Sequence, residues 1–159
     1  MSIPGMAPPT YIAPHFLEQR GITDREYALW LDKQSEAIWR RERKAGKTAF
    51  PSRASLKAEL HRVLLAGNGR DQYTGSKIYW KHLRADWVDG NAGVTNYRHL
   101  MTLRRCMPTF DHVRGMGHRR YALCRRMTNH AKSFMSPAQF VALCREVVRH
   151  HERGGHVGT

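Results

Sequence analysis

At 159 residues the chain is long enough for one compact domain with a helical extension, and its three cysteines, which lack a Cys-x-x-Cys pair, do not fit a disulfide framework or a zinc knuckle. It carries 27 Lys and Arg against 13 Asp and Glu, a formal net charge of +14, and its mean hydropathy of -0.62 argues against a membrane protein. This charge predicts a polyanionic partner, because each basic group laid on a phosphate releases a condensed counterion. A solubilising surface and a ribosome-like scaffold are the alternatives.

The first 70 residues are expected to form an N-terminal arm followed by helices. Four of the seven prolines lie within residues 1–21, which excludes a regular helix and favours an extended arm. Thr23 and Glu26 have the spacing of a capping box, so a helix is predicted from there to Gly46. Its last turns carry cations at residues 40–44, which suits a solvated helix end or contact with a nucleic-acid backbone equally well.

Several elements follow in the next part of the chain. A second amphipathic helix is predicted to end at residues 67–69, a turn-rich loop is expected over residues 85–93, and a short helix over residues 96–105. Two strands are predicted, at Thr109–Val113 and Arg119–Cys124, joined by a glycine-containing turn. A helix holding Asn129 comes next, and Ser136 and Pro137 begin a terminal helix whose apolar stripe is expected to cover the core.

An acid and a histidine stand side by side at the end of the first predicted strand. Neighbouring strand residues point to opposite faces, so Asp111 and His112 can do different jobs. A carboxylate suits a hard divalent metal ion, and an imidazole titrates close enough to neutrality to take a proton from water. Asn129, 18 positions after Asp111, can supply a second oxygen to the same ion. The alternatives are a polar strand end for the first pair and a helix N-cap for Asn129.

The order of these residues resembles a known family. Met107-Pro-Thr-Phe-Asp-His-Val, then Tyr121-Ala-Leu-Cys-Arg-Arg, then Asn129-His-Ala-Lys-Ser is similar to the core of HNH (ββα-metal) nucleases, and Tyr73-Thr-Gly is similar to the lead-in of that core. The resemblance implies metal ligands at Asp111 and Asn129 and a general base at His112. One position departs from the pattern, because the asparagine usual on the second strand is replaced near Arg120 or Tyr121.

The expected fold is therefore α+β and mostly helical, with an HNH-like core at residues 71–153, N-terminal helices, a covering C-terminal helix and a disordered tail at residues 154–159. The expected activity is hydrolysis of DNA phosphodiester bonds with one Mg²⁺ or Mn²⁺ and without structural zinc. Basic residues near the site are expected to hold the nucleic acid: Arg114, Arg125, Arg126 and Lys132.

Two other functions are equally compatible with the positive charge of the chain. One is a non-catalytic nucleic-acid-binding protein, and the other is a subunit of a phage or mobile-element complex that docks a protein partner through the N-terminal helices. The start of the chain lacks the pattern of a secretory signal, so the expected location is the cytoplasm of a bacterial or phage-infected cell, with double-stranded DNA rather than a membrane as partner.

Overall fold

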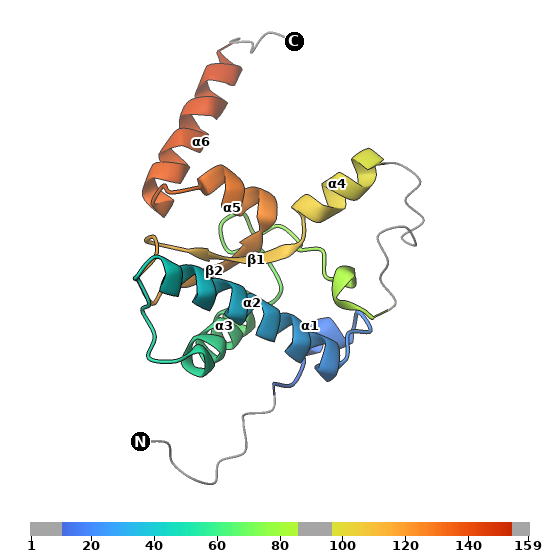
Figure 1. Cartoon of the computed structure of the whole chain (residues 1–159). Helices are drawn as coiled ribbons and strands as arrows, with labels where there is room; N and C mark the ends of the chain where they lie inside the picture. The colour runs from blue at the N-terminus through green and yellow to red at the C-terminus, as the bar shows by residue number, and fades with distance from the viewer. Residues whose placement is uncertain (1–10, 86–96, 154–159) are drawn as a thin grey trace.

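The computed structural model describes residues 11–85 and 97–153, with the side chains of residues 97–100 left out. The loop expected at residues 85–93, apart from residue 85 itself, lies outside these ranges, as do the first part of the arm and the tail expected at residues 154–159. In chain order the described elements are α1 (His15–Glu18), α2 (Asp24–Lys44), α3 (Arg53–Gly67), the 3-10 turn η1 (Lys81–Leu83), α4 (Tyr97–Arg105), β1 (Pro108–His112), β2 (Tyr121–Arg125), α5 (Arg126–Lys132) and α6 (Pro137–Glu152) (Figure 1). No helix within the described ranges is long and apolar enough to cross a membrane.

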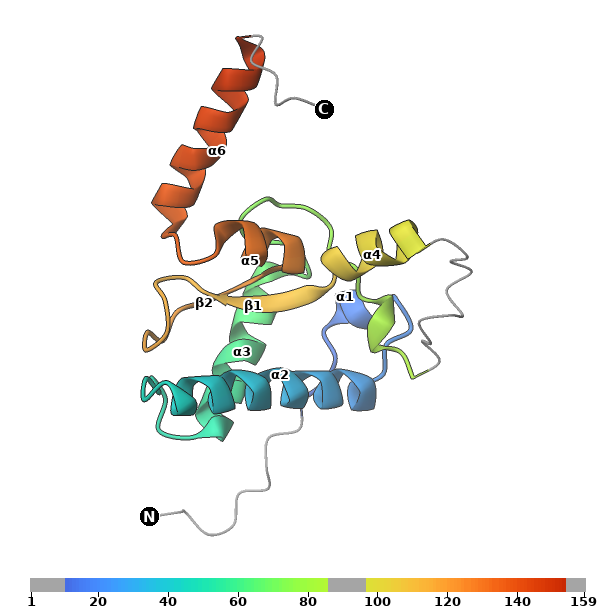
Figure 2. The same cartoon turned by 45° about the horizontal axis from the view of Figure 1, so that its top comes forward.

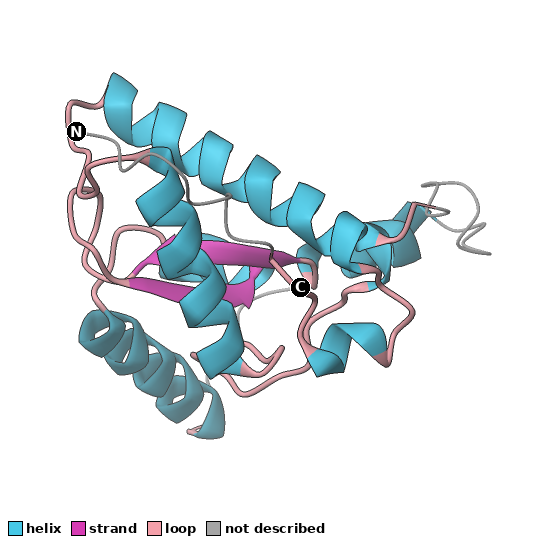
Figure 3. Cartoon of the chain, turned by 90° about the horizontal axis from the view of Figure 1, so that it is seen from below, coloured by secondary structure: helices cyan, strands magenta, loops and turns pink. Residues whose placement is uncertain are grey.

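A two-stranded antiparallel hairpin lies between two layers of helices. β1 pairs with β2 so that Asp111 stands opposite Ala122 and His112 opposite Tyr121. α5 lies on one side of the hairpin, and α2 and α3 lie on the other (Figure 2). From below, α2 and α3 cross in front of the strands (Figure 3). The α+β class and the strand-turn-strand-helix order are as predicted.

The hydrophobic core joins the N-terminal helices to the hairpin. The ring of Trp30 on α2 lies 5.7 Å from that of Phe110 on β1 and 5.5 Å from that of Trp80, measured between centroids. Leu60 and Leu64 of α3 are fully buried in the same cluster. Burying a large apolar side chain stabilises a fold by about 1.5–3 kcal/mol. Residues on both sides of position 70 therefore stabilise a single core.

The predicted helix ends agree with the structure. The Thr23 side chain accepts a hydrogen bond from the Glu26 amide, and the Glu26 carboxylate accepts one from the Thr23 amide, which completes the capping box of α2. α2 ends at Lys44, and Gly46 follows at φ 65°. Ser136 caps α6, with Pro137 in its first turn. One departure is a single helical turn, α1, within the arm that was expected to be extended throughout.

The expectation that the terminal helix covers the core is wrong. None of the residues of α6 is buried, and the helix points away from the body of the molecule (Figures 1 and 2). Its first turn lies beside the segment before the hairpin, where the ring of Phe140 is edge-on to that of Tyr73 at 6.4 Å between centroids. The hairpin already has α5 on one face and α2 with α3 on the other, so no open face remains for a further helix.

Candidate functional site

A pocket of ≈ 680 Å³ opens at the end of β1, and its walls come from α2, the hairpin and α5. It contains the three residues on which the sequence interpretation rests, Asp111, His112 and Asn129. The full lining is Arg41, Phe110, Asp111, His112, Gly115, Met116, Asn129, His130, Lys132, Ser133 and Phe134. The hairpin brings α5 back against β1, which is why residues 18 positions apart share this pocket.

Asp111 faces α5 and is tied to two partners. Its Oδ2 accepts a hydrogen bond from the Tyr73 hydroxyl at 2.6 Å and pairs with Nζ of Lys132 at 2.9 Å. Lys132 is only 1% exposed, so its charge is directed at Asp111 and not at solvent. Across the described residues no hydrogen bond reaches the other oxygen of Asp111, Oδ1, and Asp111 is one of the residues that line the pocket.

His112 faces the opposite layer, as expected for neighbouring residues of a strand. Its Nε2 lies 2.8 Å from Oε1 of Glu42 on α2, and the Tyr121 hydroxyl donates to the same oxygen. Burial lowers the pKa of His112, although the hydrogen bond and the charge of Glu42 act to raise it. The imidazole is therefore neutral at neutral pH. With a carboxylate at Nε2, the lone pair is on Nδ1.

Glu42 was not among the predicted site residues. It is fully buried, and its Oε2 is buried without a hydrogen-bond partner in the described structure. A buried carboxylate with an unsatisfied oxygen is rare in structural positions and more frequent at functional ones. The burial of Glu42 was readable in the sequence, because Leu31, Ser35, Ile38 and Glu42 follow one face of the helix, but its contact with His112 was not.

Tyr121 lies beside His112, and it is one of the two residues, with Arg120, near which the resemblance to HNH nucleases leads us to expect an asparagine. Its ring lies 4.9 Å from that of His112, and its hydroxyl fixes the carboxylate that His112 contacts. Burial and the hydrogen bond to Glu42 raise the pKa of this tyrosine, so the hydroxyl keeps its proton and remains a donor. Glu42 and Tyr121 together contact the imidazole and limit its movement.

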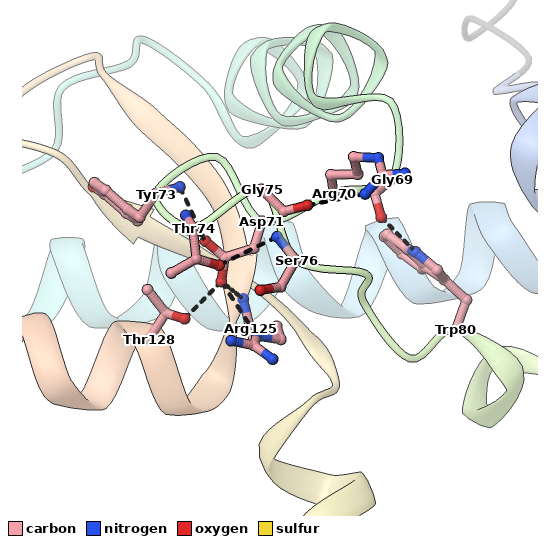
Figure 4. A network of polar contacts seen from close by, with 10 residues as sticks. All are labelled: Gly69, Arg70, Asp71, Tyr73, Thr74, Gly75, Ser76, Trp80, Arg125 and Thr128. Carbon is pink, nitrogen blue, oxygen red and sulfur yellow. Dashed lines mark hydrogen bonds and ion pairs between the residues drawn. The ribbon is translucent and has the colours of Figure 1, made fainter.

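A second buried carboxylate, Asp71, holds the segment before the hairpin (Figure 4). Its Oδ1 accepts from the amides of Tyr73 and Thr74, and its Oδ2 accepts from the Arg125 amide and the Thr128 hydroxyl. Burial raises the pKa of Asp71, but these hydrogen bonds outweigh it and lower the pKa overall. Asp71 thereby fixes Tyr73, the partner of Asp111, relative to β2 and α5.

Asn129 lies within α5, half-buried, and lines the pocket. It is not a helix N-cap, because α5 begins three residues earlier and Arg125 is in the capping position. Arg114 and Arg126 are exposed, and neither is among the residues that line the pocket. Arg125 instead pairs with Asp71 at 3.6 Å, so it and Lys132 are both engaged inside the protein.

The oxygen donors of the pocket suit a hard divalent ion such as Mg²⁺ better than they suit Zn²⁺. Within the described part of the chain no group of three or more His, Cys, Asp and Glu could hold a metal ion. One carboxylate oxygen of Asp111 and one amide oxygen of Asn129 remain, and a hard ion such as Mg²⁺ completes its shell with water and phosphate. The residues thus fit a weakly held ion at an open pocket.

Comparisons of this chain with protein-family models, with curated proteins and with solved structures find no match. We therefore infer a function from the geometry of the pocket.

Proposed function

We propose that this protein is a metal-dependent, HNH-like endonuclease that hydrolyses phosphodiester bonds of double-stranded DNA. The observation that carries the proposal is the pocket in which a neutral histidine, tied to a buried carboxylate, stands beside a carboxylate and an amide. The net charge of +14 supports a nucleic-acid substrate.

His112 acts as the general base in this proposal. Nδ1 takes a proton from a water molecule as the water oxygen bonds to phosphorus and the bond from phosphorus to the 3′ oxygen breaks. The positive charge that forms on the imidazole is stabilised by Glu42 through Nε2. The 3′ oxygen takes a proton from solvent, and His112 returns its proton to solvent.

Asp111 Oδ1 and the Asn129 side chain would hold the divalent ion, which when bound supplies charge neutralisation at the scissile phosphate. Tyr73 and Lys132 orient the Asp111 carboxylate from its other oxygen. Arg41, which lines the pocket, attracts and orients the phosphate backbone.

A non-catalytic nucleic-acid-binding protein is the second candidate. It is favoured by the ion pair between Lys132 and Asp111, because that pair already neutralises the carboxylate on which the metal depends. In this case the basic surface binds DNA, and the residues of the pocket only stabilise the fold.

Cleavage of supercoiled plasmid separates the two candidates. Wild-type protein should yield nicked or linear product with Mg²⁺ or Mn²⁺ and none with chelator. His112→Ala should lower the rate by roughly 10²- to 10⁴-fold while leaving DNA affinity near that of wild type. The matched control is His118→Ala, because this histidine is exposed in the turn after β1 and does not line the pocket.

Metal dependence is tested at Asp111. Asp111→Asn should abolish cleavage and weaken Mn²⁺ binding measured by calorimetry. Equal cleavage by wild type and His112→Ala would contradict His112 as the general base. Salt-sensitive DNA binding with no cleavage under any metal would favour the non-catalytic candidate.

A further inference from the structure

The C-terminal half of α2 carries a group of cations without acidic partners. Arg40, Arg43 and Lys44 are exposed, and no ion pair or side-chain hydrogen bond holds any of them in the described structure. The cations of α3 do have carboxylate partners, for example Arg62 with Glu59 at 2.6 Å. Unpaired cations close together repel one another, so this group favours the arrival of an anion.

These cations line a hollow of ≈ 730 Å³ together with Glu36, Ala37, Trp39, Arg41 and Arg53. The only acid of that lining, Glu36, is paired with Arg53 at 3.1 Å, which leaves the hollow strongly positive. Trp39 packs against the core and gives the hollow a fixed wall. A rigid helix therefore presents the charges in a set geometry and not on a loose tail.

Arg41 joins this hollow to the pocket of Asp111 and His112. It belongs to the lining of both, so the two depressions meet at one side chain. Arg41 also precedes Glu42, whose carboxylate contacts His112, so the cations at the helix end and the imidazole are fixed by the same turn of α2. Positive surface thus continues from the site onto the helix end.

From this continuity we infer that the end of α2 is the phosphate-binding track of the protein, along which the DNA backbone runs from the His112 pocket over Arg41 to Arg40 and Lys44. The inference rests on the proposed function for the direction of the track. The ligand it takes is the phosphodiester backbone of duplex DNA, which cations bind without reading the bases. This assigns to the N-terminal helices a role in holding substrate.

The test compares two double variants that remove the same charge. Arg40→Ala/Lys44→Ala removes two cations of the track. The control, Arg25→Ala/Lys81→Ala, also removes one Arg and one Lys, the first from the other end of α2 and the second from η1 beside it. Arg25 is exposed in the first turn of α2, roughly 22 Å from Arg40 at a rise of about 1.5 Å per residue. Lys81 is exposed on η1, which is fixed to that first turn by the hydrogen bond from the Ala85 amide to Glu26.

Affinity for a short fluorescein-labelled duplex is measured by anisotropy in chelator, between about 50 and 200 mM salt. Loss of two phosphate contacts lowers the slope of log Kd against log salt by roughly 1.8, because each contact contributes about 0.9 for B-form DNA. The track variant should lose this amount and the control less than half of it. Equal slopes for the two variants would overturn the inference.

Cleavage tells a failure of the track apart from a failure of the proposed function. The slopes are measured without metal, so they decide the track even if wild-type protein cleaves nothing. If it does cleave, the track variant should raise KM several-fold more than it lowers kcat, because these cations hold DNA away from the reacting bond. A fall in kcat with unchanged KM would contradict the track and place the cations in the chemical step.

Discussion

Glu42→Gln is the change that most directly tests how the candidate base is held. The substitution keeps the size of the side chain but removes the charge beside Nε2 of His112. It also places an amide where the buried Oε2 has no partner in the described structure. The imidazole loses its charged partner, while the core around it keeps its volume.

The expected loss follows from the geometry of one charge-assisted hydrogen bond. A hydrogen bond to a charged group contributes about 1.5–3 kcal/mol, and removing a carboxylate that orients a functional histidine typically lowers activity by roughly 10- to 100-fold. These ranges agree, since about 1.4 kcal/mol corresponds to a factor of ten. Tyr121→Phe, which leaves the charge of Glu42 in place, should lower kcat by only about 2- to 10-fold.

The pH dependence tells a positioning role from a structural one. Glu42 raises the pKa of His112 against the lowering effect of burial, so its removal should lower this pKa further. A base works in its neutral form, and the acid limb of kcat should therefore move to lower pH in Glu42→Gln. NMR titration of the His112 ring measures the same shift without any cleavage. An unchanged His112 titration together with an unchanged kcat would refute the reasoning.

Three further predictions concern stability. Asp71→Asn should lower the free energy of unfolding by about 2–4 kcal/mol, because the Arg125 amide and the Thr128 hydroxyl lose the charged oxygen to which they donate. The pKa of Asp71 is lower in the folded than in the unfolded chain, where it is about 3.9, so ionised Asp71 stabilises the fold above that pH. This stabilisation is lost as the pH falls through the folded pKa. The denaturation midpoints of the variant and the wild type should therefore converge in acid. Lys132→Met should lower the free energy of unfolding by about 3–5 kcal/mol, because it leaves the Asp111 carboxylate buried without a counter-charge. A double-mutant cycle of Lys132 and Asp111 with additive effects would contradict an interaction between the two. Gly69→Ala should destabilise the fold by about 1–3 kcal/mol more than Gly46→Ala in urea titrations, because both have positive φ but only the first sets a Cβ 2.6 Å from the ring of Phe16.

The parts of the site that are close in sequence could be predicted, and those that are distant could not. Asp111, His112 and Asn129 lie within one strand-turn-strand-helix unit, where period and turn residues decide which side chains meet. Glu42 belongs to a run of cations at a helix end and has no local spacing that connects it to His112, which is 70 positions away. The prediction that basic residues surround the site named Arg125 and Lys132, whose carboxylate partners only the tertiary structure brings near.

The orientation of α6 shows the same limit in another form. Its apolar stripe predicts a buried face, and the stripe is present, with Val147 61% exposed. An apolar stripe indicates that a helix can bury one side. Whether the core offers a free surface to that side depends on how the other helices pack, which the stripe does not reveal. In this protein both faces of the hairpin are covered, one by α5 and the other by α2 and α3 (Figure 2).

The long separation between Glu42 and His112 means that the candidate site has no self-contained half. A chain cut in the loop between α2 and α3 yields one piece with the carboxylate and another with the imidazole, and only their association restores the contact. Any activity of such a split protein would rise with the concentration of both pieces, as in fragment complementation. Transfer of residues 71–153 alone to another host protein would carry the base without the group that orients it.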